Sequence, residues 1–323
     1  MNEEEFWKAA LESLSEGKDV VIVIIIQRIG SAPNVPGAKM LVTQDSIVGT
    51  VGGGASEYKL IEIAKNMLDN RKTDIETVFL DHSIGLGEEH SGMICSGSQT
   101  FALIFLEQGD KSIVEEVHEA YSKAIPGVLI ISNEEIRYER GETLQKNNFY
   151  IKTKTGWEYK ENIGFQDQLF MIGGGHVSLA LSRIMKTLDF RITILDDRDN
   201  LPTMENNPYA HEKKVISFEN IDTYIPEGEN VYIVIMTFGH ASDELVLEKL
   251  ISCKHRYIGM MASVSKKQQV FTNLEKKGMP KELLAKVYSP IGLKIKSDTP
   301  EEIAVSIAAE IISVRNSEKG KGK

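Results

Sequence analysis

The chain is long enough for two domains, because 323 residues can bury two sizeable cores. Its formal net charge of −10 at pH 7 argues against a nucleic-acid or anionic-membrane partner, since both need a basic surface. The most apolar run, residues 20–26, is too short to span a bilayer, and no signal-type apolar segment follows the acidic first residues. We therefore expect a cytoplasmic protein with neither a nucleic-acid nor a membrane partner.

Residues 1–165 predict a mixed α+β N-terminal domain. Helical spacing of apolar residues marks its helices, and short apolar runs between turn residues mark its strands. The pattern becomes β-rich at about 110–164, which we interpret as an extension of this domain that ends in a connector near 162–166. The predicted helices are 3–15, 56–68 and 112–123, and the predicted strands are 20–26, 38–43, 47–51, 78–80, 100–106, 128–131 and 149–152.

A first glycine-rich turn lies in this domain, where Gly52, Gly53 and Gly54 stand between a predicted strand and a predicted helix. The start of a helix offers backbone N–H groups and the positive end of the helix dipole, so the turn is a candidate anion site. The same pattern also suits a flexible connection between strand and helix, and the sequence does not separate the two interpretations.

The two cysteines, Cys95 and Cys253, provide neither a disulfide framework nor a zinc ribbon, which fits a reducing compartment. Cys95 stands in a loop of small residues before an apolar strand, where nearby N–H groups can stabilise a thiolate. We interpret it either as the chemically active side chain of the protein or as an inert lone thiol. Cys253 follows an amphipathic helix and is interpreted as a packing residue.

A metal site is not expected. Two histidines and two glutamates lie in the sequence near Cys95, but their spacing matches no standard zinc pattern. These residues are His82, Glu88, Glu89 and His90.

Residues 166–323 predict a C-terminal Rossmann-like domain, because strands alternate with helices as in a parallel sheet. The last predicted helix has Thr299 as N-cap and Glu302 at the capping-box position. The fold class is therefore α/β, with a Rossmann-like parallel sheet domain following the mixed α+β domain. The predicted strands are 169–172, 191–195, 214–216, 231–235 and 257–258, and the predicted helices are 176–188, 243–252, 265–277 and 300–314.

The second glycine-rich turn, Gly173-Gly174-Gly175-His176, has the context of a dinucleotide-binding loop, with an apolar strand before it and a helix after it. Gly173 would permit the tight turn, and Gly175 would let a phosphate approach the backbone at the helix start. Asp196 ends the next strand, where it could accept a hydrogen bond from a ribose hydroxyl. Ser178 replaces the usual third glycine and is small enough for close packing. The alternative is a tight turn without a ligand.

Two histidines are further candidates for this site. His176 opens the helix after the glycine turn, where it could contact a ligand phosphate or cap the turn. His240 follows the predicted strand 231–235, and ligands collect beyond the carboxyl ends of such strands. A surface turn residue is the alternative interpretation of His240.

Several blocks in one order resemble the XdhC/CoxI family of accessory proteins for molybdenum hydroxylases such as xanthine dehydrogenase. The resemblance covers nearly the whole chain. The blocks are residues 30–33 and 37–42, the turn 49–54 with Glu57, the Cys95 loop, 173–177, 196–198, 257–259, 289–293 and 299–304. The sequence departs from the family pattern at Asn34, Ser96 and Ala262, where arginine, glycine and glycine are usual.

The resemblance implies a maturation factor and cofactor chaperone rather than a turnover enzyme. Such a protein binds molybdenum cofactor, in its molybdopterin or dinucleotide form, supports its sulfuration with a cysteine desulfurase, and delivers it to an apo-hydroxylase. Family members of this type are homodimers. The glycine turns would hold the phosphate of the cofactor, and a soft thiolate such as Cys95 could contact molybdenum or the transferred sulfur.

Two other functions remain open from the residues alone. The Rossmann turn and Asp196 also suit an NAD(P)-dependent oxidoreductase, although no residue stands out as a hydride-transfer acid or base. A nucleotide-sensing regulatory protein would need the same turn without turnover.

Overall fold

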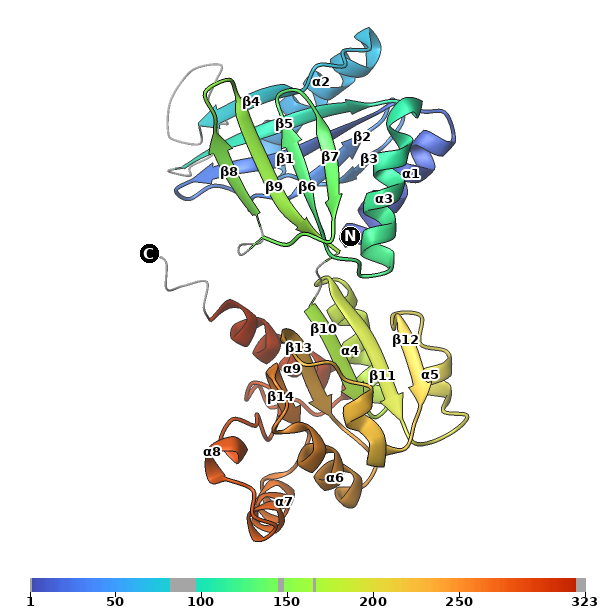
Figure 1. Cartoon of the computed structure of the whole chain (residues 1–323), viewed down its shortest axis with the longest axis vertical. Helices are drawn as coiled ribbons and strands as arrows, with labels where there is room; N and C mark the ends of the chain where they lie inside the picture. Colours follow the sequence, from blue (N-terminus) through green and yellow to red (C-terminus); the bar gives the residue numbers. More distant parts are fainter. Residues whose placement is uncertain (1, 82–96, 145–147, 165–166, 318–323) are drawn as a thin grey trace. The chain divides into compact units, whose positions relative to one another are not determined.

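The computed structural model describes residues 2–81, 97–144, 148–164 and 167–317. The chain divides into two compact units, unit 1 (Met1–Phe165) and unit 2 (Gln166–Lys323). Within the described ranges, no helix has the length and hydropathy needed to cross a membrane. The fold class is α/β, with a parallel sheet in unit 2 and antiparallel sheets in unit 1 (Figure 1).

Unit 1 is built around a five-stranded antiparallel sheet in the order β3-β2-β1-β5-β4. The central strand β1 is an almost continuous run of valine and isoleucine, because both of its faces are buried. Helix α2 packs on one face of this sheet. The elements are β1 (Val20–Ile29), β2 (Lys39–Val42), β3 (Ile47–Gly49), α2 (Gly54–Asn70), β4 (Glu76–Asp81) and β5 (Ser98–Leu106).

The opposite face of this sheet shares one core with helices α1 and α3 and with a second antiparallel sheet. That sheet has the order β7-β6-β9-β8. The predicted β-rich segment therefore contributes directly to the main core of unit 1. The elements are α1 (Glu3–Ser15), the 3-10 turn η1 (Gln108–Asp110), α3 (Lys111–Ser122), β6 (Gly127–Ser132), β7 (Ile136–Arg140), β8 (Asn148–Lys152) and β9 (Trp157–Ile163).

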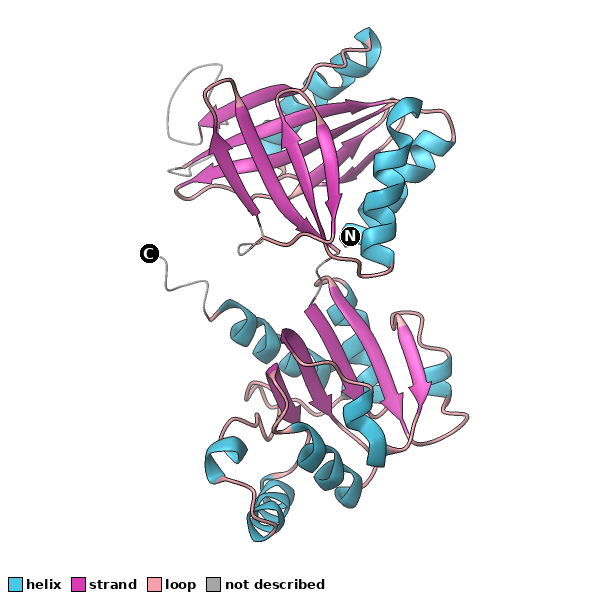
Figure 2. Cartoon of the chain, viewed as in Figure 1, coloured by secondary structure: helices cyan, strands magenta, loops and turns pink. Residues whose placement is uncertain are grey.

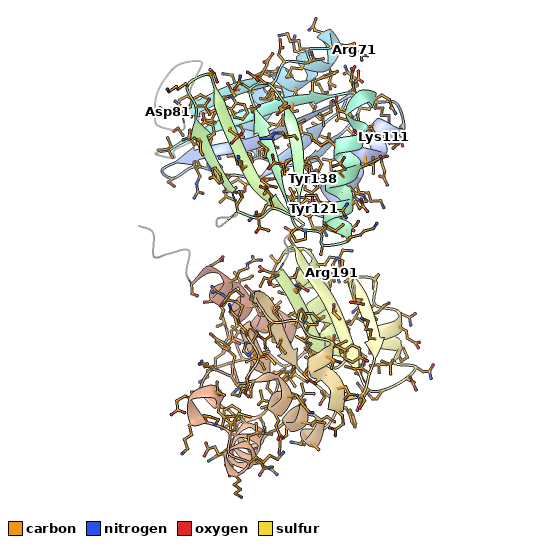
Figure 3. All side chains as sticks on the ribbon, in the orientation of Figure 1. Arg71, Asp81, Lys111, Tyr121, Tyr138 and Arg191 are labelled. Atoms are coloured by element: carbon orange, nitrogen blue, oxygen red, sulfur yellow. The ribbon has the colours of Figure 1, made fainter. Side chains whose placement is uncertain are left out.

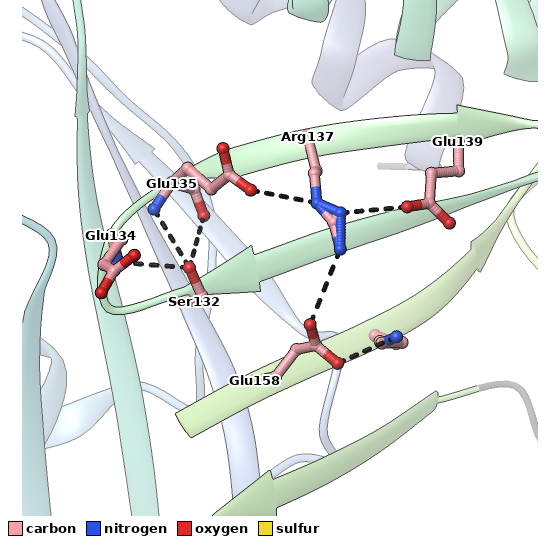
Figure 4. A network of polar contacts seen from close by, with 7 residues as sticks. Ser132, Glu134, Glu135, Arg137, Glu139 and Glu158 are labelled. Carbon is pink, nitrogen blue, oxygen red and sulfur yellow. Dashed lines mark hydrogen bonds and ion pairs between the residues drawn. The ribbon is translucent and has the colours of Figure 1, made fainter. Parts of the chain in front are cut away.

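Strands β7 and β9 are absent from the sequence prediction, and the predicted connector at 162–166 is wrong at its start because β9 continues to Ile163. Both strands alternate apolar and charged residues, and the charges pair on the open face of the sheet (Figure 4). Arg137 lies 3.1 Å from Glu135, 3.0 Å from Glu139 and 3.7 Å from Glu158. Cross-strand charge pairing thus makes a strand of residues that resemble a polar loop in the sequence.

Unit 2 has a five-stranded parallel sheet in the order β12-β11-β10-β13-β14. In sequence order this is third, second, first, fourth, fifth, which is the Rossmann arrangement. The chain direction across the sheet reverses between β10 and β13, and ligands bind at such a point. The strands are β10 (Asp167–Ile172), β11 (Phe190–Asp196), β12 (Glu212–Val215), β13 (Gly228–Ile235) and β14 (His255–Met260).

Helices cover both faces of this sheet (Figure 2). One face packs against α4 and α9, and the other packs against α6, α7, α8 and the 3-10 turn η2. The capping box predicted at Thr299 and Glu302 is confirmed at the start of α9. The helices are α4 (His176–Lys186), α5 (Pro202–Glu205), η2 (Phe218–Thr223), α6 (His240–Leu250), α7 (Val264–Lys276), α8 (Lys281–Leu284) and α9 (Pro300–Asn316).

Candidate functional site

The candidate site is the carboxyl edge of the parallel sheet, where the turn after β10 meets the ends of β11 and β13. The Gly173 N–H donates to the carbonyl of Leu195 at 2.8 Å, and the Met236 N–H donates to the carbonyl of Ile172 at 2.8 Å. These bonds fix three neighbouring chain segments against one another. The glycine turn therefore has a rigid support on both sides.

Gly173 and Gly174 are required by packing. Gly173 has φ +110°, and a Cβ atom on it would lie 2.2 Å from the carbonyl oxygen of Met236. A Cβ on Gly174 would lie 2.8 Å from Cβ of Met204. Ser178 is fully buried under the turn, as the prediction of close packing requires. The first two glycines thus let the backbone approach its neighbours, and neither has free space beside it.

Gly175 differs, because a Cβ atom on it would meet nothing within 4 Å. It is the N-cap of α4, and no described side chain caps this helix start. His176, the first helical residue, is exposed. The start of α4 therefore presents its backbone and dipole to open space, which is the geometry that suits a phosphate.

The Asp196 carboxylate is engaged inside the protein. It is 1% exposed and accepts hydrogen bonds from the Gly174 N–H at 2.7 Å and from Nε and Nη2 of Arg198, each at 2.8 Å. Burial alone would raise the pKa of Asp196, but these bonds outweigh it and hold the pKa below its ordinary value. A ribose hydroxyl would have to displace Arg198 to reach this carboxylate, so the predicted ribose contact of Asp196 is not formed by the side chain as it lies here.

The loop after β13 supplies side chains that the sequence did not single out. Phe238 is 90% exposed, and its ring centroid lies 5.5 Å from the guanidinium carbon of Arg198. Beneath it, the fully buried Asp243 accepts from the Thr237 N–H at 3.0 Å and from its hydroxyl, and it also pairs with Lys266. This buried network fixes the loop and so holds Phe238 in place.

His176 and His240 open α4 and α6, the helices that follow the neighbouring strands β10 and β13. Both side chains are exposed. Because these strands are parallel, both histidines belong to the carboxyl edge. Arg198 and Phe238 could have been noticed from their positions just after predicted strands, but their pairing depends on the strand order.

The first glycine turn, in unit 1, has its amides occupied by a side chain of its own helix. Glu57 accepts hydrogen bonds from the Val51 N–H at 2.9 Å, the Gly53 N–H at 3.1 Å and the Thr50 hydroxyl at 2.5 Å. These bonds overcome the effect of burial and lower the pKa of Glu57. An external phosphate at Gly52, Gly53 or Gly54 would have to displace this carboxylate.

A buried charge cluster supports the loop 30–37 that precedes β2 in unit 1. Lys39 Nζ lies 2.8 Å from Glu161, 3.0 Å from Glu3 and 2.9 Å from the carbonyl oxygen of Gly37. The Tyr159 hydroxyl donates to Glu161 at 2.7 Å. Although burial would lower the pKa of Lys39, the two carboxylates raise it, so the ammonium stays charged. The cluster positions the loop from below.

A cavity of about 240 Å³ lies in unit 1 between α3 and β7. Tyr138, labelled in Figure 3, lines it together with Glu116, Glu119 and Arg140. Burial raises the pKa of Tyr138, so its phenol stays neutral. The charged lining gives this cavity no apolar surface comparable to that at the carboxyl edge of unit 2.

Cys95 and the neighbouring His82, Glu88, Glu89 and His90 lie outside the described residues. Cys253 is half-buried, and burial raises the pKa of its thiol. Among residues 2–81, 97–144, 148–164 and 167–317, no group of three or more histidine, cysteine, aspartate or glutamate side chains could hold a metal ion.

Comparison with known proteins agrees with this architecture. The family described as "XdhC Rossmann domain" matches residues 169–311, and that described as "XdhC and CoxI family" matches residues 13–78. The chain belongs to the XdhC/CoxI family. The 173–177 and 299–304 blocks lie within the first match, and the 30–42 and 49–54 blocks lie within the second.

Similar proteins cover nearly the whole chain. A Bacillus subtilis (strain 168) protein, named as a probable component of xanthine dehydrogenase, is 24% identical over 94% of this chain and 95% of its own length. The uncharacterized protein YqeB of Escherichia coli (strain K12) is 27% identical over 92% of this chain, which spans only 43% of that protein. A crystal structure from Bacillus halodurans, described as a xanthine dehydrogenase, shares the fold with a TM-score of 0.77, 22% identity and coverage of 100% and 98%.

Proposed function

We propose that this chain is an accessory factor for a molybdenum hydroxylase of the xanthine dehydrogenase type. It binds molybdenum cofactor, supports its sulfuration by a cysteine desulfurase, and delivers it to the apo-enzyme as a homodimer. Membership of the XdhC/CoxI family supports this proposal, as does the name of the B. subtilis relative.

The observation that carries the proposal is the open start of α4. A phosphorylated ligand needs N–H donors that no side chain of the protein already occupies, and Gly175 provides free space above them. Arg198 neutralises Asp196, so the nearest buried carboxylate does not repel an anion. The residues that would hold the phosphate are Gly175 and His176. The cofactor itself supplies the molybdenum and sulfur chemistry when it is bound.

The test is to purify the protein from a cofactor-producing host, oxidise it, and measure the fluorescent pterin product. We expect pterin to accompany the protein, and we expect the hydroxylase activity of the host to fall when the chain is deleted. Absence of pterin together with unchanged hydroxylase activity would remove the proposal.

Cys95 remains the predicted sulfur or molybdenum contact, and Cys253 offers a matched control because it is the other cysteine of the chain. We expect Cys95→Ala to reduce activation of the hydroxylase while pterin binding is retained. Cys253→Ala should change neither. Full activation by Cys95→Ala would exclude a thiol role.

The Rossmann strand order also favours a second candidate, a nucleotide-dependent oxidoreductase or sensor. Calorimetric titration with NAD, NADP and AMP separates the two. Tight nicotinamide binding with turnover would support the oxidoreductase, and nucleotide binding without turnover would support the sensor.

A further inference from the structure

A cavity of about 260 Å³ lies directly beside the glycine turn of unit 2. Leu201 and Met204, which line it, are also the side chains closest to Gly174, at 3.0 and 2.8 Å from the position of an added Cβ. The Thr203 hydroxyl donates to the carbonyl oxygen of Gly174 at 2.6 Å. One wall of the cavity is therefore fastened to the turn that leads into α4.

The lining combines apolar surface with two cations. Leu201, Met204 and Val215 provide the apolar part, and Arg198 and Lys213 provide the charges. The Lys213 ammonium is held in place by two backbone carbonyl oxygens, at 2.8 and 3.2 Å. We call this the Arg198 cavity.

Arg198 is suited to bind a flat ring. Its guanidinium is planar and fixed by two hydrogen bonds to Asp196, and such a group stacks well on aromatic rings. It already lies 5.5 Å from the Phe238 ring centroid. The rigid anchoring means that little side-chain entropy is lost when a ring binds against it.

The volume limits what the Arg198 cavity can hold. Pockets for whole small-molecule ligands are commonly about 300–1,000 Å³. At about 260 Å³ the cavity fits one ring system rather than a complete dinucleotide. Because Asp196 is buried and paired, recognition here would depend on apolar contact and stacking instead of a carboxylate–ribose bond.

We propose that the Arg198 cavity is a nucleobase subsite, which takes the planar base of a nucleotide whose phosphate lies at the start of α4. The assignment rests on the proposed function for the identity of the full ligand, since it would select the dinucleotide form of the cofactor. The base contact itself follows from the cavity and from Arg198.

The test compares AMP and CMP with ribose 5-phosphate, which has the same phosphate and sugar but no base. Stacking of a base on a protein side chain is worth enough to raise affinity by about tenfold. We expect at least one of the two nucleotides to bind the full chain about tenfold more tightly than ribose 5-phosphate in calorimetric titration. Equal affinities, or no binding of either nucleotide, would overturn the subsite.

A filling variant locates the effect. Val215→Trp places a large ring in the cavity from a position that is 51% exposed, so folding should be preserved. Val305→Trp is the matched control, because Val305 is equally exposed on α9 and does not line the cavity. We expect Val215→Trp to abolish the advantage of the nucleotide without changing the affinity for ribose 5-phosphate. An unchanged advantage would contradict the assignment.

The outcomes separate this assignment from the proposed function. Equal affinities for nucleotides and ribose 5-phosphate, with pterin still purified from the host, would overturn only the subsite. A clear advantage of a nucleotide that Val215→Trp removes, without pterin or hydroxylase activation, would support the subsite and overturn the accessory role.

Discussion

The two glycine turns look alike in sequence and differ in what their amides bind. In unit 1, Glu57 lies one turn into α2 and folds back onto the amides of its own turn. In unit 2, Asp196 comes from the neighbouring strand and takes only the Gly174 N–H, which leaves the Gly175 end open. A glycine-rich helix start therefore becomes an anion site only where the chain supplies no anion of its own.

The largest effect is expected at Gly173. Gly173→Ala would put a Cβ 2.2 Å from a backbone carbonyl oxygen at φ +110°, where side chains are strained. Overpacking and backbone strain together should lower the free energy of unfolding of unit 2 by about 4 kcal/mol. Both tryptophans, Trp7 and Trp157, lie in unit 1, so circular dichroism should follow unit 2 and fluorescence should follow unit 1. Loss of the fluorescence transition instead would contradict this assignment.

Arg198→Met should have the next largest effect. It leaves the buried Asp196 carboxylate without its charged partner, and hydrogen bonds to charged groups are worth about 1.5–3 kcal/mol. We expect a loss of about 2 kcal/mol in unit 2, measured by urea unfolding followed by circular dichroism. The double variant Arg198→Met with Asp196→Asn should recover part of the loss. A double variant less stable than the single one would show that the pair is not coupled as described.

Glu57→Gln tests the closed turn of unit 1 through pH. The pKa of Glu57 is lowered from its ordinary 4.5, so its carboxylate stabilises the fold above that pH, and the stabilisation is lost as the pH falls through the folded-state value. The variant should be about 1 kcal/mol less stable at pH 7, and the difference should shrink below about pH 4. Tryptophan fluorescence in urea measures both. A difference independent of pH would exclude the charge as the cause.

The smallest stability effect is expected for Gly175→Ala. Its Cβ would meet no atom within 4 Å and its φ is −73°, so unfolding of unit 2 should change by less than about 0.5 kcal/mol. The same variant narrows the approach of a phosphate to the helix start. Weaker binding of ribose 5-phosphate with unchanged thermal unfolding is the expected pair of results. A large loss of stability would mean that Gly175 is a packing residue like Gly174.

Local patterns in the sequence predicted most elements, because their causes lie within one element. The bounds of α1 follow from apolar spacing and the glycine after it, and the strand–turn–helix context at Gly173 identified the Rossmann turn. The pairing of Arg198 with Phe238 could not be predicted, since it requires β10 to lie between β11 and β13. The return of Glu57 to its own turn was likewise hidden, because a glutamate in a first helical turn can equally face solvent.

The most direct measurement places one carboxylate in each turn and assays the cofactor that purifies with the protein. Gly175→Asp puts a negative charge at the open start of α4, whereas Gly53→Asp puts it at the turn that Glu57 already occupies. We predict that the fluorescent pterin product is lost from Gly175→Asp and retained by Gly53→Asp, with both proteins folded by circular dichroism. Pterin retained by Gly175→Asp and lost from Gly53→Asp would show that the cofactor is not held at the start of α4.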